Sequence, residues 1–194
     1  MCNPENYIYG SNIVINLTIN DGFDVESKWY INGKYSFSIF HPGRGLRVYT
    51  DIRSYDIPGQ LDISINASNP VSFFIDSITI YNYYRLEGFS FNGRHGTINE
   101  DTEFTLKLSS SSPQPQGTVH YIIEFGDGNS TSGMVSSTDA KLMNPGLSFL
   151  KRYYTEASYI VTAILSSPVD TVNLTSEIKI VEPIRSIAVS RSIS

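Results

Sequence analysis

Apolar and polar residues alternate along most of this chain, and no segment shows a convincing helical period. The clearest alternation lies in segment 13–19, where one phase is apolar and the other carries Asn16 and Thr18. A period of two residues is that of a β-strand with one buried and one exposed face. Comparable segments are 25–31, 35–39, 47–54, 61–65 and 71–81. The pattern therefore predicts a chain built from short β-strands.

Three features of these segments predict local structure. Asn32-Gly33 follows the second segment, and this dipeptide is the strongest short signal for a β-hairpin. Trp29 falls in the inward phase of its strand, so we expect it in the core. In segment 71–81 the apolar phase changes near Asp76-Ser77, which predicts a β-bulge there. The residues expected to point inward are Val71, Phe73 and Ile75 before the change and Ile78 and Ile80 after it.

The pattern begins again in the second half of the chain. Tyr55 aligns with Tyr153, at an offset of 153 − 55 = 98 residues, and the apolar positions that follow each tyrosine also align. Trp29 aligns with Ile123 at the similar offset of 123 − 29 = 94. Two copies of one module explain both offsets.

The repeat sets the expected domain boundaries. We expect module 1 at residues 1–84 and module 2 at residues 85–183. The segment Glu182–Val189 resembles Tyr84–Phe91, which opens module 2. Residues 184–194 are therefore expected to be the start of a further module or a tail.

A turn in module 2 carries a family resemblance. The strand 121–125 runs into Gly126-Asp127-Gly128, whose glycines permit the positive φ angles of a tight turn. The sequence Ile123-Glu-Phe-Gly-Asp-Gly128 resembles the Trp-Asp-Phe-Gly-Asp-Gly signature of the PKD (polycystic kidney disease) domain. The segment Tyr153–Val161 resembles that family's later Tyr-x-x-Pro-Gly-x-Tyr-x-Val turn and strand, with Ala157 where Gly is usual. Ile65–Phe74 resembles strand ends in polycystin-1-like proteins and receptors for egg jelly.

This resemblance implies a fold and a role. The fold is all-β, with two tandem immunoglobulin-like (PKD) β-sandwiches. The implied role is adhesion, recognition or spacing in the ectodomain of a membrane-anchored, polycystin-1-like protein, at a cell surface such as that of a cilium or a sperm. The implied partners are other proteins or neighbouring modules of the same protein, and glycans.

Composition and charge exclude several classes of function. The formal charge is −5 and no basic patch occurs, so nucleic-acid binding is not expected. No run of 18 apolar residues exists, so we expect no direct membrane insertion. The single cysteine, Cys2, excludes an internal disulfide and, with three scattered histidines, argues against a zinc site. Cys2 is either a free thiol or paired outside this chain, and no cofactor or metal is expected.

Four Asn-x-Ser/Thr triplets predict exposure to the secretory pathway. Asn16, Asn66 and Asn173 fall in the polar phase of their strands, and Asn129 follows the Gly-Asp-Gly turn. All four could carry a glycan without disturbing a core. We therefore expect an extracellular or cell-surface glycoprotein.

The search for catalytic residues favours a non-enzyme. Asp51, Asp56 and Asp62 are expected on a solvated face rather than as paired carboxylates. His41, His95 and His120 cannot be placed beside a Ser or Cys by their spacing, and no Gly-x-Ser-x-Gly or Walker pattern occurs. Asp127 and Asn129 are explained by the turn better than by a calcium loop.

One aromatic cluster is a candidate interaction site. Tyr81, Tyr83 and Tyr84 could stack on sugar rings or on a partner, although packing between the modules is the preferred interpretation. Two other functions stay open beside adhesion. One is a self-assembling filament or surface-layer subunit, joined through exposed edge strands. The other is an accessory module of a secreted hydrolase that binds polysaccharide.

Overall fold

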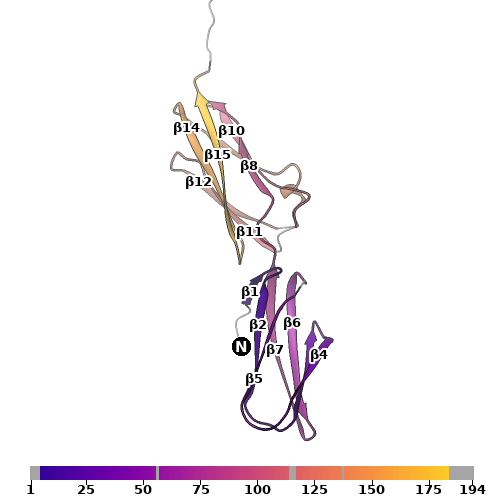
Figure 1. The fold of residues 1–194 in the computed structure, drawn as a ribbon. Coiled ribbons are helices and arrows are strands. Elements are labelled where there is room, and N and C mark those ends of the chain that lie inside the picture. The colour runs from indigo at the N-terminus through magenta and orange to yellow at the C-terminus, as the bar shows by residue number, and fades with distance from the viewer. Residues whose placement is uncertain (1–4, 56, 114–116, 137, 184–194) are drawn as a thin grey trace, which may run out of the picture. The chain divides into compact units, whose positions relative to one another are not determined.

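The structure, a computed structural model, describes residues 5–55, 57–113, 117–136 and 138–183. It divides into two compact units, Met1–Arg85 and Leu86–Ser194, and both are built almost entirely of β-strands (Figure 1). The predictions for Cys2, Asp56 and residues 184–194 fall outside the described residues.

Unit 1 is a sandwich of two unequal sheets. Its larger sheet has five strands in the order β1-β7-β6-β3-β4, and its smaller sheet pairs β2 with β5. The strands are β1 (Glu5–Ile8), β2 (Asn12–Ile19), β3 (Val25–Ile31), β4 (Lys34–His41), β5 (Arg47–Ser54), β6 (Gly59–Asn69) and β7 (Ser72–Tyr83).

The alternating pattern produces the core of unit 1. Trp29 is 1% exposed, as predicted, and stacks on Phe37 with 5.2 Å between ring centroids. Asn32 and Gly33 have φ angles of 49° and 76° and join β3 to β4, which confirms the predicted hairpin. The buried apolar residues of this core are Ile13, Ile15, Trp29, Tyr55, Leu61, Ile63 and Ile80.

The predicted bulge in β7 is wrong. β6 and β7 pair without interruption from Gly59 opposite Asn82 to Asn69 opposite Ser72. With an unbroken register, Ile78, Asp76 and Phe74 share the phase of Ile80, and burial of this phase ends at Ile78 because Asp76 and Phe74 are exposed. Val71, Phe73 and Ile75 therefore do not point inward; they are 90%, 74% and 57% exposed. The apolar residues at this end of β7 follow no single buried face, which is why the sequence pattern misled.

Unit 2 is also a sandwich, and its strands are distributed differently. One sheet has the order β13-β10-β8 and the other β12-β11-β14-β15-β9. Its elements are β8 (Phe89–Gly93), β9 (Gly96–Thr97), β10 (Asp101–Leu108), β11 (Thr118–Glu124), β12 (Ser130–Ser136), the 3₁₀ helix η1 (Ala140–Leu142), β13 (Leu147–Arg152), β14 (Ala157–Ser166) and β15 (Thr171–Val181).

The internal repeat relates the two cores. Trp29 on β3 and Ile123 on β11 are both buried, as are Tyr55 and Tyr153. Among the residues that the structure describes, the connected core cluster of unit 2 contains 16 buried apolar residues, whereas that of unit 1 contains seven. Unit 1 thus encloses a smaller core than its repeat partner.

Candidate functional site

The four predicted glycosylation residues lie in different surroundings. Asn16, Asn129 and Asn173 are exposed. Asn66 is half-buried in the middle of the five-stranded sheet, and its Oδ1 is buried without a hydrogen-bond partner among the described residues. Asn16 Oδ1 accepts a hydrogen bond from the Thr50 hydroxyl at 2.7 Å. Glycosylation stays a prediction at each of them.

The three tyrosines are half-buried within unit 1. Tyr81 and Tyr83 stack on each other with 6.3 Å between ring centroids. Tyr84 packs against Tyr9 with 4.7 Å between centroids. Each ring therefore has an aromatic neighbour within unit 1, and binding of a sugar or a partner by these tyrosines stays a prediction.

The turn that carries the family resemblance is a closed hydrogen-bonded structure. The Phe125 N–H donates to the Asn129 carbonyl at 2.9 Å, and the Tyr153 hydroxyl donates to the Phe125 carbonyl at 2.9 Å. Gly126 has a φ of 76°, and a Cβ at this position would lie 2.6 Å from the Ile160 carbonyl oxygen. Only glycine fits such a position, so this turn needs a glycine for structural reasons.

Asp127 ties this turn to the neighbouring strand β13. Its carboxylate lies 2.7 Å from Lys151 Nζ, and the Asn129 amide donates to it at 3.0 Å. Burial alone would raise the pKa of Asp127, but the hydrogen bonds from Lys151 and Asn129 outweigh burial and lower the pKa below its ordinary value. The Asp127 carboxylate is thus a structural partner of Lys151.

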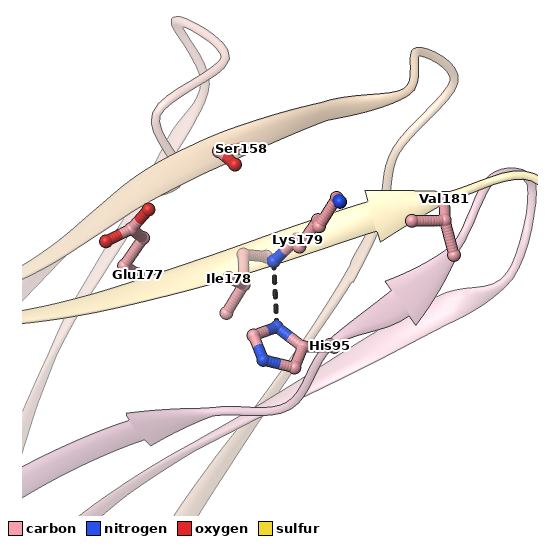
Figure 2. Close-up of a pocket in the computed structure, with 6 residues that line it drawn as sticks. All are labelled: His95, Ser158, Glu177, Ile178, Lys179 and Val181. Atoms are coloured by element: carbon pink, nitrogen blue, oxygen red, sulfur yellow. Dashed lines mark hydrogen bonds between the residues drawn. The ribbon is translucent and has the colours of Figure 1, made fainter.

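A shallow hollow of about 480 Å³ lies on unit 2 beside β15 (Figure 2). It contains Ser, His and Glu side chains, the residue types of a nucleophilic hydrolase. However, His95 Nδ1 accepts the backbone N–H of Lys179 at 2.9 Å. Among the described residues, no hydrogen bond joins His95 to Ser158 or Glu177. The nucleophile–base contact that such chemistry needs is not formed here.

A Ser–His pair does exist, and sequence reasoning missed it. Ser27 Oγ lies 2.9 Å from His41 Nε2, and the Trp29 indole N–H donates to the same oxygen at 3.2 Å. Ser27 and His41 are 0% and 7% exposed. Burial is the main cause that lowers the pKa of His41, and the Arg47 guanidinium adds to it. The pair is enclosed, with Ser27 and His41 both buried, so it joins strands β3 and β4 within the core.

Asp51 corrects another expectation. It was expected on a solvated face, but it is only 4% exposed. Arg53 Nη2 donates to it at 2.6 Å and the Tyr55 hydroxyl at 3.1 Å, while Arg53 lies over the Phe37 ring. A buried carboxylate requires such partners. The inward phase of β5 therefore carries Asp51 and Arg53 beside Tyr49, which reasoning from a period of two residues did not predict. Asp62 is exposed, as expected.

An apolar surface covers the outer face of the β6–β7 hairpin tip. It consists of Val71, Phe73 and Ile75, and we call it the hairpin surface. Single exposed apolar residues are common, whereas adjacent ones mark interaction sites. The sequence signal for the hairpin surface is the density of apolar residues in 71–75, for which the alternating pattern predicts a place in the core.

A long groove opens on unit 1 between β2 and β7, with a volume of about 1280 Å³. Its acidic lining residues are Asp21 and Asp76, and no Lys or Arg of the described chain lines it. Its apolar lining residues include Ile13, Ile15, Leu17, Ile63, Ile65, Ile78 and Ile80. No pattern in the sequence predicts this groove, because the groove depends on which strands are adjacent in space.

Two further searches of the structure concern metals and membranes. Within the described ranges, no group of three or more His, Cys, Asp or Glu side chains could hold a metal ion. No helix in the same ranges has the length and apolar character needed to cross a bilayer.

Comparison with known proteins relates this chain to immunoglobulin-like structures. No family model matches the sequence, and no curated protein is significantly similar to it in sequence. An ectodomain fragment of ICAM-5 superposes with a TM-score of 0.58 over 93% of this chain, at 8% identity. A three-domain segment of titin gives 0.53 over 92% at 11% identity, and a second titin segment, of three Ig domains, gives 0.54 over 92% at 12% identity.

These likenesses establish the fold. The chain is a tandem of two immunoglobulin-like β-sandwiches, as the sequence predicted. It spans 52% of the ICAM-5 fragment and 62% of each titin segment.

Proposed function

We propose that this chain is a non-catalytic adhesion or recognition tandem of an extracellular protein, and that it binds a protein partner through the hairpin surface. The observation that supports this role is the exposure of Val71, Phe73 and Ile75 at one end of unit 1, at 90%, 74% and 57%. Such a patch loses water-exposed apolar area when a partner covers it, and this is the main favourable term in association.

The form of the sandwich is consistent with this proposal. Phe73 and Ile75 of the hairpin surface lie on β7, whose ladder with β6 is uninterrupted, so their side chains are held on a rigid support. Lys28 and Asn66 lie opposite each other on the neighbouring strands β3 and β6 and supply a polar margin. An apolar centre with a polar margin is the usual composition of a protein interface.

The finer assignment is to a PKD-like module of a polycystin-1-like glycoprotein at the cell surface. Support comes from the Phe125–Asn129 turn and its hydrogen bond with Tyr153, which give the family signature a structural role. The exposed sequons Asn16, Asn129 and Asn173 support an extracellular location. Secretion from a eukaryotic cell, followed by mass spectrometry of the three sites, tests this assignment; three unmodified sites would oppose it.

A bead-adhesion experiment tests the adhesion role. Beads coated with the full chain are expected to adhere to cells of at least one type, and the double variant Phe73→Ser, Ile75→Ser should remove most of that adhesion. Ile160→Ser is the control, since Ile160 is 65% exposed and lies on β14 of unit 2, outside the hairpin surface. Equal adhesion by both variants, or none by the unmodified chain on any cell type, would refute the proposal.

A further inference from the structure

The outer face of the two-stranded sheet in unit 1 is exposed and carries no charged side chain. β2 pairs with β5 along its whole length, and the inward phase of β2 supplies Ile13 and Ile15 to the core. On the opposite phase, Val14, Val48 and Ile52 are 52%, 63% and 61% exposed. Adjacent exposed apolar side chains mark a contact surface. We call this surface the small-sheet face, and its side chains are Asn12, Val14, Asn16, Thr18, Val48, Thr50, Ile52 and Ser54.

The internal repeat shows that this composition is specific to unit 1. Leu150 of β13 is the counterpart of Ile52, at an offset of 150 − 52 = 98 residues. The cross-strand partner of Leu150 is Glu103, whereas that of Ile52 is Val14. The charged side chains on this phase of unit 2 are Asp101, Glu103, Lys107 and Arg152. The same face is therefore charged in unit 2 and uncharged in unit 1, so the unit 1 face suits a neutral neighbour.

A glycosylation sequon lies at the centre of the small-sheet face. Asn16-Leu-Thr18 places Asn16 on this face, opposite Thr50 and two residues after Val14. Side chains two positions apart on a strand are about 7 Å apart, and a diagonal cross-strand neighbour such as Ile52 is about 7–8 Å away. Neither sequon of unit 2 lies on the corresponding strands β10 and β13. A sugar joined to Asn16 therefore lies beside the apolar part of the face.

The Asn16 side chain is oriented for attachment of a glycan. Its Oδ1 accepts a hydrogen bond from the Thr50 hydroxyl at 2.7 Å, which fixes the amide group. Among the described residues, no hydrogen bond holds its Nδ2, the atom to which an N-linked glycan is joined. Asn129 differs, because its Nδ2 donates to the Asp127 carboxylate at 3.0 Å. Asn16 thus presents an oriented and unengaged amide nitrogen on an exposed strand.

The chemistry of a glycan fits the small-sheet face. The first sugar of an N-linked glycan is N-acetylglucosamine, whose ring C–H groups and acetyl methyl group are apolar and whose hydroxyl groups are polar. Contact between the apolar groups and Val14 and Ile52 removes apolar area of both partners from water. Asn12 and Ser54, the next cross-strand pair along the face, supply hydrogen-bonding groups for the sugar hydroxyls. A neutral sugar needs no charged partner here.

We propose that the glycan on Asn16 lies flat on the small-sheet face, with its first sugars packed over Val14 and Ile52. This side of Asn16 is favoured because two apolar side chains lie opposite each other there, whereas Val48 on the other side lies opposite Thr18. The glycan covers exposed apolar area of unit 1 and slows the opening of the β2–β5 pair. This inference rests on the extracellular location proposed above.

Release of the glycan under native conditions tests the contact. Peptide N-glycosidase must reach the bond between Asn16 and the sugar, so a glycan that lies on the sheet is cleaved only after it lifts away. In the chain secreted from a eukaryotic cell, release at Asn16 should be at least about fivefold slower than at Asn173, which lies between Thr171 and Thr175 on its face of β15. Mass spectrometry of peptides measures both rates in one sample, and equal rates would overturn the proposal.

Two variants locate the contact on the face. Ile52→Ser removes an apolar side chain that the sugar would cover, so release at Asn16 should become several-fold faster. Val48→Ser is the matched control, because Val48 is similarly exposed and also diagonal to Asn16, but lies on the side that the glycan leaves uncovered. Both side chains are exposed, so folding is retained, and circular dichroism of the two variants checks this. No acceleration by Ile52→Ser, or an equal acceleration by Val48→Ser, would overturn the proposal.

Hydrogen–deuterium exchange tests the effect on the sheet. Thr18→Ala removes the sequon but keeps Asn16 and its hydrogen bond with Thr50. In chains secreted from a eukaryotic cell, the amides of β2 and β5 should exchange about three- to tenfold faster in Thr18→Ala than in the glycosylated chain. The same two chains made in bacteria, without glycans, give the effect of the substitution itself, which should be smaller. A difference of the same size in both pairs would show that the glycan does not stabilise the sheet and would overturn the proposal.

The other sequons separate a failure of this inference from a failure of the proposed location. A secreted chain modified at Asn129 or Asn173 but not at Asn16 would overturn this inference and leave the extracellular location in place. A secreted chain without a glycan at any site would oppose the location and would overturn this inference with it.

Discussion

Asn66 on β6 lies directly opposite Ile75 on β7, so a predicted glycosylation residue is the cross-strand neighbour of the hairpin surface. A glycan is bulky and polar. If Asn66 carries one, we expect the glycan to cover Phe73 and Ile75 and to reduce bead adhesion several-fold. The measurement compares the glycosylated chain with Asn66→Gln, which should restore adhesion. Asn173→Gln, on the other unit, serves as control, and equal adhesion by glycosylated and Asn66→Gln chains would contradict the expectation.

The two glycines of the signature turn should differ in their tolerance of alanine. Both have positive φ angles, 76° at Gly126 and 84° at Gly128, so alanine costs about 1–2 kcal/mol at either. At Gly126 the added Cβ would also meet the Ile160 carbonyl oxygen, whereas no atom lies within 4 Å of a Cβ at Gly128. Urea unfolding should therefore show a larger loss for Gly126→Ala, above about 2 kcal/mol. Equal losses of unfolding free energy in the two variants would show that the backbone near Gly126 and Ile160 moves to accommodate the added Cβ.

The Asp127–Lys151 pair should stabilise unit 2 in a pH-dependent manner. Because the folded pKa of Asp127 is lowered, its contribution is complete above the ordinary value of 3.8 and is lost as the pH falls through the lowered pKa. Asp127→Asn should cost roughly 1–2 kcal/mol at pH 7. The difference in unfolding free energy between Asp127→Asn and the unmodified chain should become smaller below about pH 4.

Asp101 provides the control for that measurement. Its pair with Arg152 has the similar length of 2.9 Å, but both side chains are 50% exposed. Asp101→Asn should therefore change the unfolding midpoint much less than Asp127→Asn. If Asp101→Asn lowers the unfolding midpoint as much as Asp127→Asn does, then the partial burial of the Asp127–Lys151 pair does not increase its contribution to stability.

Lowering the pH should destabilise unit 1 through His41. Its folded pKa is lowered by burial and by Arg47, so the unfolded chain binds the proton first. Stability is complete above about pH 6.5 and falls as the pH is lowered through that value toward the folded pKa. Thermal unfolding followed by near-ultraviolet circular dichroism should show this loss of stability. In His41→Asn, the stability of unit 1 should depend less on pH. His120→Asn, an exposed site on unit 2, should leave it unchanged.

Sequence reasoning succeeded where local chemistry decides the structure. The Asn32-Gly33 hairpin and the burial of Trp29 follow from φ preferences and from a period of two residues. Sequence reasoning failed where contacts between residues distant in the sequence determine which side chains are buried. Asp51 is buried because Arg53 and Tyr55 satisfy it, and Ser27 meets His41 across two strands. Phe73 is exposed because an unbroken register, invisible in the sequence, turns it outward.

Trp29 is the single tryptophan of the chain, and it lies wholly within unit 1. Its indole N–H donates to Ser27, which in turn contacts His41, so the local field at the ring changes with the charge on that imidazole. Emission excited at the red edge of its absorption therefore reports unit 1 alone, while unit 2 contributes only tyrosine signal. The molecule carries its own optical probe for separating the denaturation of one sandwich from that of the other.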